Sequence, residues 1–270
     1  MPVKKSIVIV GCGWLGLALA ARLFSKDIPI IATRSTETGV EELLSRNIKA
    51  ILLSLKPELD APNLSQIENS DIAVILIPPR SRQGQTNYPK QIEHLVTGLE
   101  LYGVNKIIFA SSTSVYPLIN RRVDETELIP DSDNPRKLVR AAELVVVENP
   151  NIKSIVVRFA GLCGPGREPG RLLAGRKNLS GGTNPVNLIH QQDAVSILVG
   201  LIEYEPWQEI FNACAPIHPT KAQLYTDAAD KLGLEKPHFK SSEEHFKQVD
   251  SNKICHSINF SYAFPDPNQW

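Results

Sequence analysis

The fold is decided by the opening stretch Ser6-Ile7-Val8-Ile9-Val10-Gly11-Cys12-Gly13-Trp14-Leu15-Gly16. Its first half is a short apolar, β-branched run of the kind that forms a buried strand, and an apolar helical stretch follows to Phe24. Three glycines separate the two at the spacing GxGxxG. Gly11 permits a sharp turn, Gly13 lets the backbone approach a phosphate, and Gly16 lets the helix lie close to the strand.

This strand, turn and helix predict a nucleotide-binding site. The first amides of a helix have no partner within the helix, and the positive end of the helix dipole favours an anion. We therefore assign the pyrophosphate of a dinucleotide to the turn and to the helix start at Trp14 and Leu15. The alternative is a purely structural turn; a strand directly before the glycines and a helix directly after them favour binding.

The composition excludes several other classes of protein. Lys and Arg total 29, and Asp and Glu also total 29, so bulk electrostatics give no reason to expect a nucleic-acid or membrane partner. No apolar run approaches the roughly 20 residues that span a bilayer. The four cysteines are scattered without a CxxC pair, which predicts reduced thiols, a cytoplasmic location and no metal site.

Strand-like and helix-like segments alternate through the first half of the chain and predict a parallel sheet covered on both faces. We expect an α/β protein with a doubly wound Rossmann sheet and a small C-terminal substrate lobe. The sheet domain is assigned to 1–163 and 187–215, and the lobe to 164–186 and 216–270. The expected strands are 28–32, 50–54, 71–77, 106–111, 154–158 and 210–214, and the expected helices are 39–46, 87–102, 138–148, 194–204 and 221–232.

The end of the second strand bears on the choice between NAD and NADP. A carboxylate there would bind the adenosine ribose and repel a 2′-phosphate, but the sequence reads Ala32-Thr33-Arg34-Ser35. Arg34 offers a cationic fork to a phosphate, and Ser35 offers a hydroxyl. NADP is therefore preferred over NAD as the cofactor. Alternatively, Arg34 is a solvated loop residue that stacks on an adenine ring.

Five segments, in order along the chain, carry a family resemblance. Besides the glycine turn they are Ile108–Tyr116 (IFASSTSVY), Arg158–Pro165 (RFAGLCGP), Asn187–Asp193 (NLIHQQD) and Asp250–Ile254 (DSNKI). Together they resemble the extended short-chain dehydrogenases/reductases, the NAD-dependent epimerase/dehydratase group, in an atypical bacterial subgroup. The resemblance implies a Rossmann fold, a nicotinamide cofactor and a catalytic Ser/Thr–Tyr–Lys group.

The chain departs from the family at this catalytic group. Ser112 matches the family's serine. In the helix that should carry YxxxK, anchoring on Glu143 puts Pro135 in place of Tyr and Val139 in place of Lys. Because Tyr needs a neighbouring cation to act at neutral pH, the usual proton relay cannot be built from this helix. The acid/base site is therefore expected to be rearranged.

Other residues are assigned by their place in the fold. Ile77 ends the fourth expected strand and Pro78 follows it, and both are expected to pack on the cofactor. Ser111 is also assigned to the cofactor. Ser112 is a candidate to polarise a carbonyl, and Tyr116 is a candidate for a displaced acid/base, although a packing role suits Tyr116 better.

Three residues of the second half are candidates for binding the substrate. Arg167 and Arg171, in glycine- and proline-rich loops, are suited to clamping an anion, although they also fit ordinary solubility. His190 is a further candidate, with a structural hydrogen bond as the alternative. Asp193 is expected to cap the next helix.

Two functions remain open at this stage. The first is an NAD(P)-binding, epimerase/dehydratase-like oxidoreductase that acts on an unknown small molecule, anionic or nucleotide-linked. The second is a non-catalytic NADP(H)-binding sensor or interaction protein, which the absent Tyr and Lys favour. The intact substrate lobe favours the enzyme, and a homodimer is compatible with the family.

Overall fold

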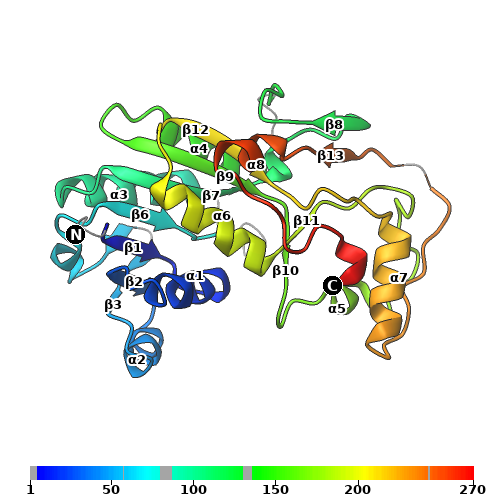
Figure 1. Cartoon of the computed structure of the whole chain (residues 1–270), viewed down its shortest axis with the longest axis horizontal. Coiled ribbons are helices and arrows are strands. Elements are labelled where there is room, and N and C mark those ends of the chain that lie inside the picture. The colour runs from blue at the N-terminus through cyan, green and yellow to red at the C-terminus, as the bar shows by residue number, and fades with distance from the viewer. Residues whose placement is uncertain (1–4, 57, 80–86, 130–135, 243) are drawn as a thin grey trace. The chain divides into compact units, whose positions relative to one another are not determined.

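The computed structural model describes residues 5–56, 58–79, 87–129, 136–242 and 244–270 (Figure 1). The chain divides into two compact units. Unit 1 consists of Met1–Val115, Asp131–Val157 and Leu198–Ile210. Unit 2 consists of Tyr116–Pro130, Arg158–Ile197 and Phe211–Trp270. Within the described ranges, no helix combines the length and apolarity needed to cross a bilayer.

The main sheet has seven strands in the order β12-β9-β7-β6-β1-β2-β3. The pairs β1–β2, β1–β6, β2–β3 and β6–β7 are all parallel, as expected for a Rossmann sheet. Strand order reverses between β1 and β6, and in such sheets ligands bind beyond the carboxyl ends of the strands at this point. The seven strands are β1 (Ile7–Val10), β2 (Ile30–Arg34), β3 (Ala50–Leu52), β6 (Ile72–Ile75), β7 (Lys106–Ser112), β9 (Lys153–Phe159) and β12 (Glu209–Ala213).

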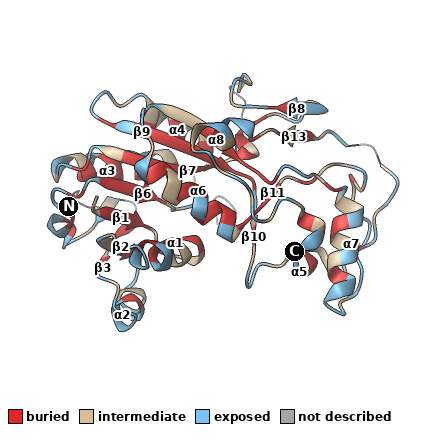
Figure 2. Ribbon diagram, viewed as in Figure 1, coloured by how far each residue is buried: buried red, intermediate tan, exposed pale blue. Residues whose placement is uncertain are grey.

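Helices cover both faces of this sheet, with α1 on one face and α3 and α4 on the other (Figure 1). The predicted apolar stripe of α3 is confirmed, because Ile92, Leu95, Val96 and Leu99 are all buried in one core cluster with β1, β6 and β7. Figure 2 shows the same strands as an almost continuous buried layer. Together with α2 and α6, these helices have the following bounds: α1 (Trp14–Phe24), α2 (Glu37–Ser45), α3 (Tyr88–Leu101), α4 (Arg136–Val147) and α6 (Gln191–Glu203).

The second strand lies two residues later than the sequence predicted. Asp27 has a left-handed backbone (φ 52°), and the amide of Ile7 donates to the carbonyl of Pro29, so the preceding turn extends further along the chain. Strand β2 consequently runs to Arg34, and the side chain of that residue emerges at the carboxyl edge of the sheet. This shift matters for the cofactor site because Arg34 becomes part of a strand and is not a loop residue.

Unit 2 contains small parallel pairs and short helices. Strands β10 (Gly161–Cys163) and β11 (Leu188–His190) pair with each other. Strands β8 (Arg121–Val123) and β13 (Lys247–Val249) form a second pair, so residues 116–130 group with unit 2, whereas the sequence assigned them to the sheet domain. The helices of this unit include α5 (Pro169–Leu173), α7 (Lys221–Lys231) and α8 (Asn252–Ser257).

Candidate cofactor-binding site

The glycine turn after β1 is held by contacts with the two neighbouring strands. Gly11 has φ +88°, and a Cβ added there would lie 2.9 Å from Cγ1 of Ile77, which follows β6. The amide of Gly11 donates to Oγ1 of Thr33 at 3.0 Å, and the amide of Cys12 donates to the Thr33 carbonyl at 2.9 Å. Both the positive φ and the close packing against Ile77 therefore require a glycine at position 11.

The other two glycines have different reasons to be small. A Cβ on Gly16 would lie 3.0 Å from the carbonyl oxygen of Gly11, so α1 can approach β1 only with glycine there. Around Gly13, apart from its chain neighbours, no heavy atom of the described residues lies within 4 Å of such a Cβ. The space in front of Gly13 is open, and protein packing does not explain this glycine.

Helix α1 begins at this open space without a cap. Gly13, its N-cap residue, offers no side chain, and the first turn contains no acidic residue. Trp14 is half-buried and Leu15 is buried at the helix start. The first-turn amides and the positive end of the helix dipole are thus directed to an anion, so these residues fit a dinucleotide pyrophosphate.

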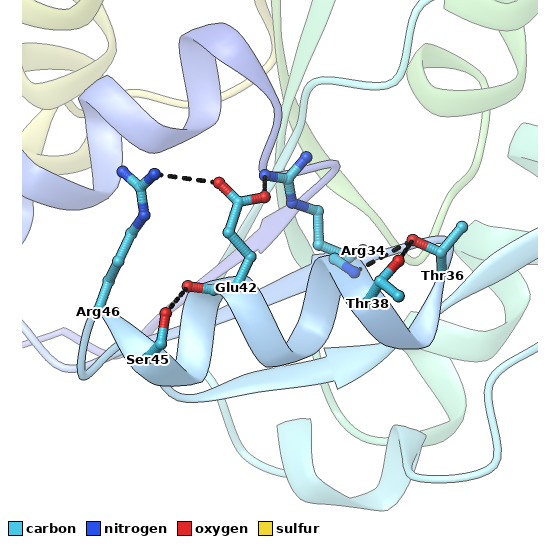
Figure 3. Close-up of polar contacts among 7 residues, drawn as sticks. Arg34, Thr36, Thr38, Glu42, Ser45 and Arg46 are labelled. Carbon is cyan, nitrogen blue, oxygen red and sulfur yellow. Dashed lines mark hydrogen bonds and ion pairs between the residues drawn. The ribbon is translucent and has the colours of Figure 1, made fainter.

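Arg34 lies at the end of β2 and is paired with a carboxylate. Its Nη2 lies 3.1 Å from Oε2 of Glu42 on α2, and the other oxygen of Glu42 lies 3.1 Å from Nη2 of Arg46 (Figure 3). Ser35 is exposed next to Arg34. The predicted phosphate contact is therefore a member of a three-residue ionic group.

The opposite side of the site is formed by the turn after β6. Ile77 is partly buried and its carbonyl accepts a hydrogen bond from the hydroxyl of Tyr88 at 2.8 Å, while Pro78 is exposed. Burial raises the pKa of Tyr88, and the negative charge of Glu143 adds to the rise. The Tyr88 hydroxyl fixes the backbone of the turn beside Gly11.

Two serines end β7, and their side chains have different partners. Oγ of Ser111 donates to Oε1 of Glu143 on α4 at 2.5 Å, and Glu143 is fully buried. Nη1 of Arg140 donates to the other carboxylate oxygen at 2.9 Å. Ser112 is only partly buried, and its Oγ accepts from the amide of Ser114 at 3.1 Å, which leaves its hydroxyl proton able to donate.

The helix that carries YxxxK in the resembled family has no such pair in the part of α4 that the structure describes. Val139 is buried and apolar where the resemblance places Lys. Pro135, which stands in the place of Tyr, lies outside the described residues. On α4, Glu143 accepts a hydrogen bond from the hydroxyl of Ser111, and Arg140 pairs with that carboxylate.

Tyr116, the displaced acid/base candidate, is fully buried in unit 2. Its hydroxyl donates to Oδ1 of Asn212 at 2.8 Å and accepts from Nη1 of Arg158 at 2.9 Å. Burial raises the pKa of Tyr116, against the charge of Arg158. Both hydrogen-bonding roles of the Tyr116 hydroxyl are thus taken by buried partners, which favours the packing role over the acid/base role.

His190 and Asp193 hold the segment near residue 264. The ring of His190 stacks on Phe264 with centroids 3.8 Å apart, and its Nδ1 accepts from the amide of Gln192. The prediction that Asp193 caps a helix is wrong, since α6 begins two residues earlier and Asp193 lies in its first turn. Its carboxylate accepts from the amides of Ala263 and Phe264 at 2.9 and 3.0 Å.

The two candidate substrate arginines occupy a turn and a short helix of unit 2. The amide of Arg167 donates to the Gly164 carbonyl at 2.8 Å and forms a tight turn. Arg171, in α5, lies 3.3 Å from Oε2 of Glu168, and its side chain is largely exposed. Since Glu168 is its neighbour within one turn, the charge of Arg171 is partly balanced locally.

Comparison with curated sequences finds Protein YeeZ of Escherichia coli, in strain K12 and in O157:H7, as a relative of matching length. Protein YeeZ of Escherichia coli strain K12 is 35% identical to the chain over 268 residues, which cover 97% of each protein. The chain belongs to the YeeZ family. No family model matches the sequence.

Solved structures agree on the architecture. A functionally unknown conserved protein from Silicibacter pomeroyi has a TM-score of 0.81 at 19% identity, covering 98% of this YeeZ-family chain and 96% of the other. MoeE5 in complex with UDP-glucuronic acid and NAD has a TM-score of 0.78 at 18% identity (98% and 97%). The UDP-glucuronic acid 4-epimerase from Bacillus cereus in complex with NAD has 0.77 at 17% (98% and 96%).

These likenesses confirm the predicted fold. The YeeZ-family chain has the Rossmann architecture of NAD-dependent epimerases and of the short-chain dehydrogenase/reductase superfamily. At such low identities the likeness concerns the fold alone.

Three contributors to the site were missed by sequence reasoning. Thr33 supports the glycine turn, and Glu42 and Arg46 surround Arg34. The spacing of Glu42 and Arg46 on a helix signals an i,i+4 ion pair in the sequence. Nothing local signals that Arg34 joins them, because that contact depends on how α2 packs beside β2.

Proposed function

We propose that this YeeZ-family protein is a nicotinamide-dinucleotide-dependent, epimerase/dehydratase-like oxidoreductase. The observation that carries the proposal is the open space at Gly13, beside the uncapped start of α1 and at the point where strand order reverses. A glycine that the protein's own packing does not require, at a site suited to anions, is best explained by a ligand that approaches the backbone. The NAD named with MoeE5 and with the Bacillus cereus epimerase supports this choice of ligand.

The cofactor would be held entirely by unit 1. Gly11, Gly13 and Gly16 with the amides of Trp14 and Leu15 bind the pyrophosphate. Arg34 and Ser35 stand where the adenosine ribose is expected, and they favour NADP over NAD. Ile77, Pro78 and Ser111 line the nicotinamide end.

Bound nicotinamide supplies a hydride donor and acceptor. Ser112 keeps a hydroxyl proton that is able to donate, so it orients and polarises a substrate carbonyl. The substrate is proposed to be a small nucleotide-linked sugar, a class supported by the UDP-glucuronic acid named with MoeE5. Arg167, Arg171 and His190 of unit 2 are the residues proposed to contact it.

A second function is favoured by α4. Val139 is buried and apolar where the resemblance places the catalytic Lys, so the family's proton relay lacks one member. A protein of this kind that binds NADP(H) without turnover would serve as a redox sensor or a partner platform. Isotope transfer separates the two functions.

The first experiment tests cofactor binding by fluorescence titration of NADPH and NADH. The variant Gly13→Ala places a methyl group in the open space, so we expect at least tenfold weaker binding at unchanged thermal stability. The control is Gly103→Ala, at a glycine with φ +77° that lies outside the glycine turn. This variant should lose about 1 kcal/mol in the free energy of unfolding and bind the cofactor as wild type does. Binding that is equal in wild type and Gly13→Ala would refute the proposed site.

The second experiment tests turnover. Deuterium-labelled NADPH is incubated with a panel of aldehydes, ketones and oxidised nucleotide sugars, and products are analysed by mass spectrometry. Transfer to a nucleotide sugar supports the enzyme. Tight NADPH binding without transfer to any member of the panel supports the sensor.

A further inference from the structure

The group formed by Arg34, Glu42 and Arg46 has more positive than negative charge. One carboxylate is shared by two guanidinium groups, with both N–O distances at 3.1 Å, so the group keeps one unit of positive charge (Figure 3). Glu42 and Arg46 have side chains about half exposed, 45% and 57%, whereas Arg34 is 23% exposed. Glu42 therefore lies at the surface with solvent on one side, whereas Arg34 is largely covered.

The packing of α2 fixes Arg34. Gly39 lies in the first turns of this helix, where glycine is an unfavourable residue. A Cβ on Gly39 would lie 3.1 Å from Cβ and 3.2 Å from Cγ of Arg34, so the missing side chain makes room for the stem of the arginine. Thr36 caps the helix by accepting from the Gly39 amide at 3.2 Å (Figure 3).

Arg34 also retains unused donor capacity. Its Nε is buried and has no hydrogen-bond partner among the described residues. A guanidinium offers five N–H donors in a rigid fork that matches a phosphate. The carboxylate of Glu42 accepts from the Nη2 end of that fork.

The group lies beside the glycine turn. Burial raises the pKa of the Cys12 thiol, within that turn, to about 11, and the charges on Arg34 and Arg46 oppose the rise while that on Glu42 adds to it. Thr33, the residue before Arg34, accepts hydrogen bonds from the amides of Gly11 and Cys12 at 3.0 and 2.9 Å, so Arg34 directly follows the residue that holds the glycine turn. A phosphate on the adenosine end of the same ligand would fall within reach of Arg34.

We propose that Arg34 and Arg46 form a site for the 2′-phosphate of NADP, and that Glu42 is the resident anion which this phosphate displaces. The proposal rests on the proposed function and extends it to two residues, Glu42 and Arg46. A phosphate monoester carries more charge and more acceptor oxygens than a carboxylate. We therefore expect it to bind the two guanidinium groups more strongly than Glu42 does. NAD, which has a ribose hydroxyl at this position, leaves the ion pairs intact.

The carboxylate of Glu42 affects how strongly the site distinguishes NADP from NAD. NADP must break two ion pairs before it gains its own, so Glu42 limits the preference for NADP. Removing the charge of Glu42 should therefore strengthen NADPH binding, whereas removing Arg46 should weaken it. A purely structural role for Arg46 would affect both cofactors alike.

The test measures dissociation constants by isothermal titration calorimetry for NADPH and NADH, and for adenosine 2′,5′-bisphosphate and AMP as probes without nicotinamide. For Arg46→Ala we expect NADPH and the bisphosphate to bind about threefold to tenfold more weakly, with NADH and AMP unchanged. For Glu42→Gln we expect NADPH to bind about threefold more tightly. Arg34→Ala should have the largest effect on NADPH, more than tenfold.

The control is Arg22→Ala, an exposed arginine in the last turn of α1, at the opposite end of that helix from the glycine turn. It removes the same charge and should change no dissociation constant. Thermal melting of each variant verifies that it is folded.

Failures of the two proposals are distinguishable. If NADPH and NADH both bind, but Arg46→Ala and Glu42→Gln change them by equal factors or not at all, the phosphate site is refuted and the proposed function stands. If wild type binds neither cofactor, the proposed function fails and the phosphate site fails with it.

Discussion

Ser111 at the end of β7 donates its hydroxyl proton to Glu143 of α4 at 2.5 Å, and this pair joins two segments that are 32 residues apart. Glu143 is fully buried, and its second oxygen is bonded to Arg140 at 2.9 Å. A buried carboxylate is stable only when its oxygens are paired. The pair therefore fixes α4 against the strand that presents Ser112.

Removing that carboxylate should destabilise unit 1. Glu143→Ala leaves the Ser111 hydroxyl and the Arg140 guanidinium without this partner, so we expect a loss of about 3 kcal/mol in the free energy of unfolding. Glu143→Gln keeps the shape and should lose less. Urea denaturation measures both, with Glu148→Ala as the control, an exposed glutamate just after the same helix that should change stability by less than about 0.5 kcal/mol. Equal losses at positions 143 and 148 would contradict the structural role.

The proposed role of Ser112 predicts a defect in turnover without a defect in binding. Ser112→Ala removes a donor that would stabilise negative charge on a substrate oxygen, so hydride transfer should fall by about 100-fold. NADPH affinity should stay within about twofold, because Ser112 is not assigned to the cofactor. The matched control is Ser114→Ala, which keeps the backbone amide that contacts Ser112 and should transfer hydride at the wild-type rate. A wild-type rate for Ser112→Ala would remove this residue from the proposed mechanism.

The buried hydroxyl of Tyr116 predicts a defect in stability. Tyr116→Phe takes one hydrogen bond from Arg158 and one from Asn212, both buried, and should cost about 1–3 kcal/mol. The partly buried Tyr102 provides the control, since Tyr102→Phe removes a hydroxyl outside the fully buried core and should be nearly neutral. If Tyr116→Phe is as stable as wild type but loses hydride transfer, Tyr116 acts in proton transfer after all.

Two histidines of unit 2 predict loss of stability in mild acid. Burial lowers the pKa of His190 and of His218 below the ordinary value of 6.5. The folded protein therefore binds these protons less tightly than the unfolded chain, so the contribution to stability is present above about pH 6.5 and is lost as the pH falls through the lowered values.

Melting temperatures between pH 5 and pH 7.5 test this prediction. The decline towards pH 5 should be shallower in the double variant His190→Gln/His218→Gln than in wild type. The control variant His238→Gln changes an exposed histidine and should keep the wild-type slope. A double variant with the wild-type slope would show that other groups control the acid sensitivity.

The sequence by itself determined the Rossmann architecture and the place of the candidate cofactor site. Local sequence patterns predict these features. They are an apolar run, three spaced glycines and a helix start at residues 7–24, and an apolar stripe along α3. Local patterns are readable because strands and helices have fixed periods and because tight turns need particular residues.

Only the tertiary structure decided which polar groups meet. Ser111 with Glu143, Arg34 with Glu42, and Asp193 with the amides of Ala263 and Phe264 join segments between 8 and 71 residues apart. A carboxylate in a sequence fits a cap, a surface or a buried pair equally well, and its partner is fixed only when the elements pack. For the same reason, the sequence could name Arg34 as a phosphate ligand, but it could not show that a glutamate already holds that arginine.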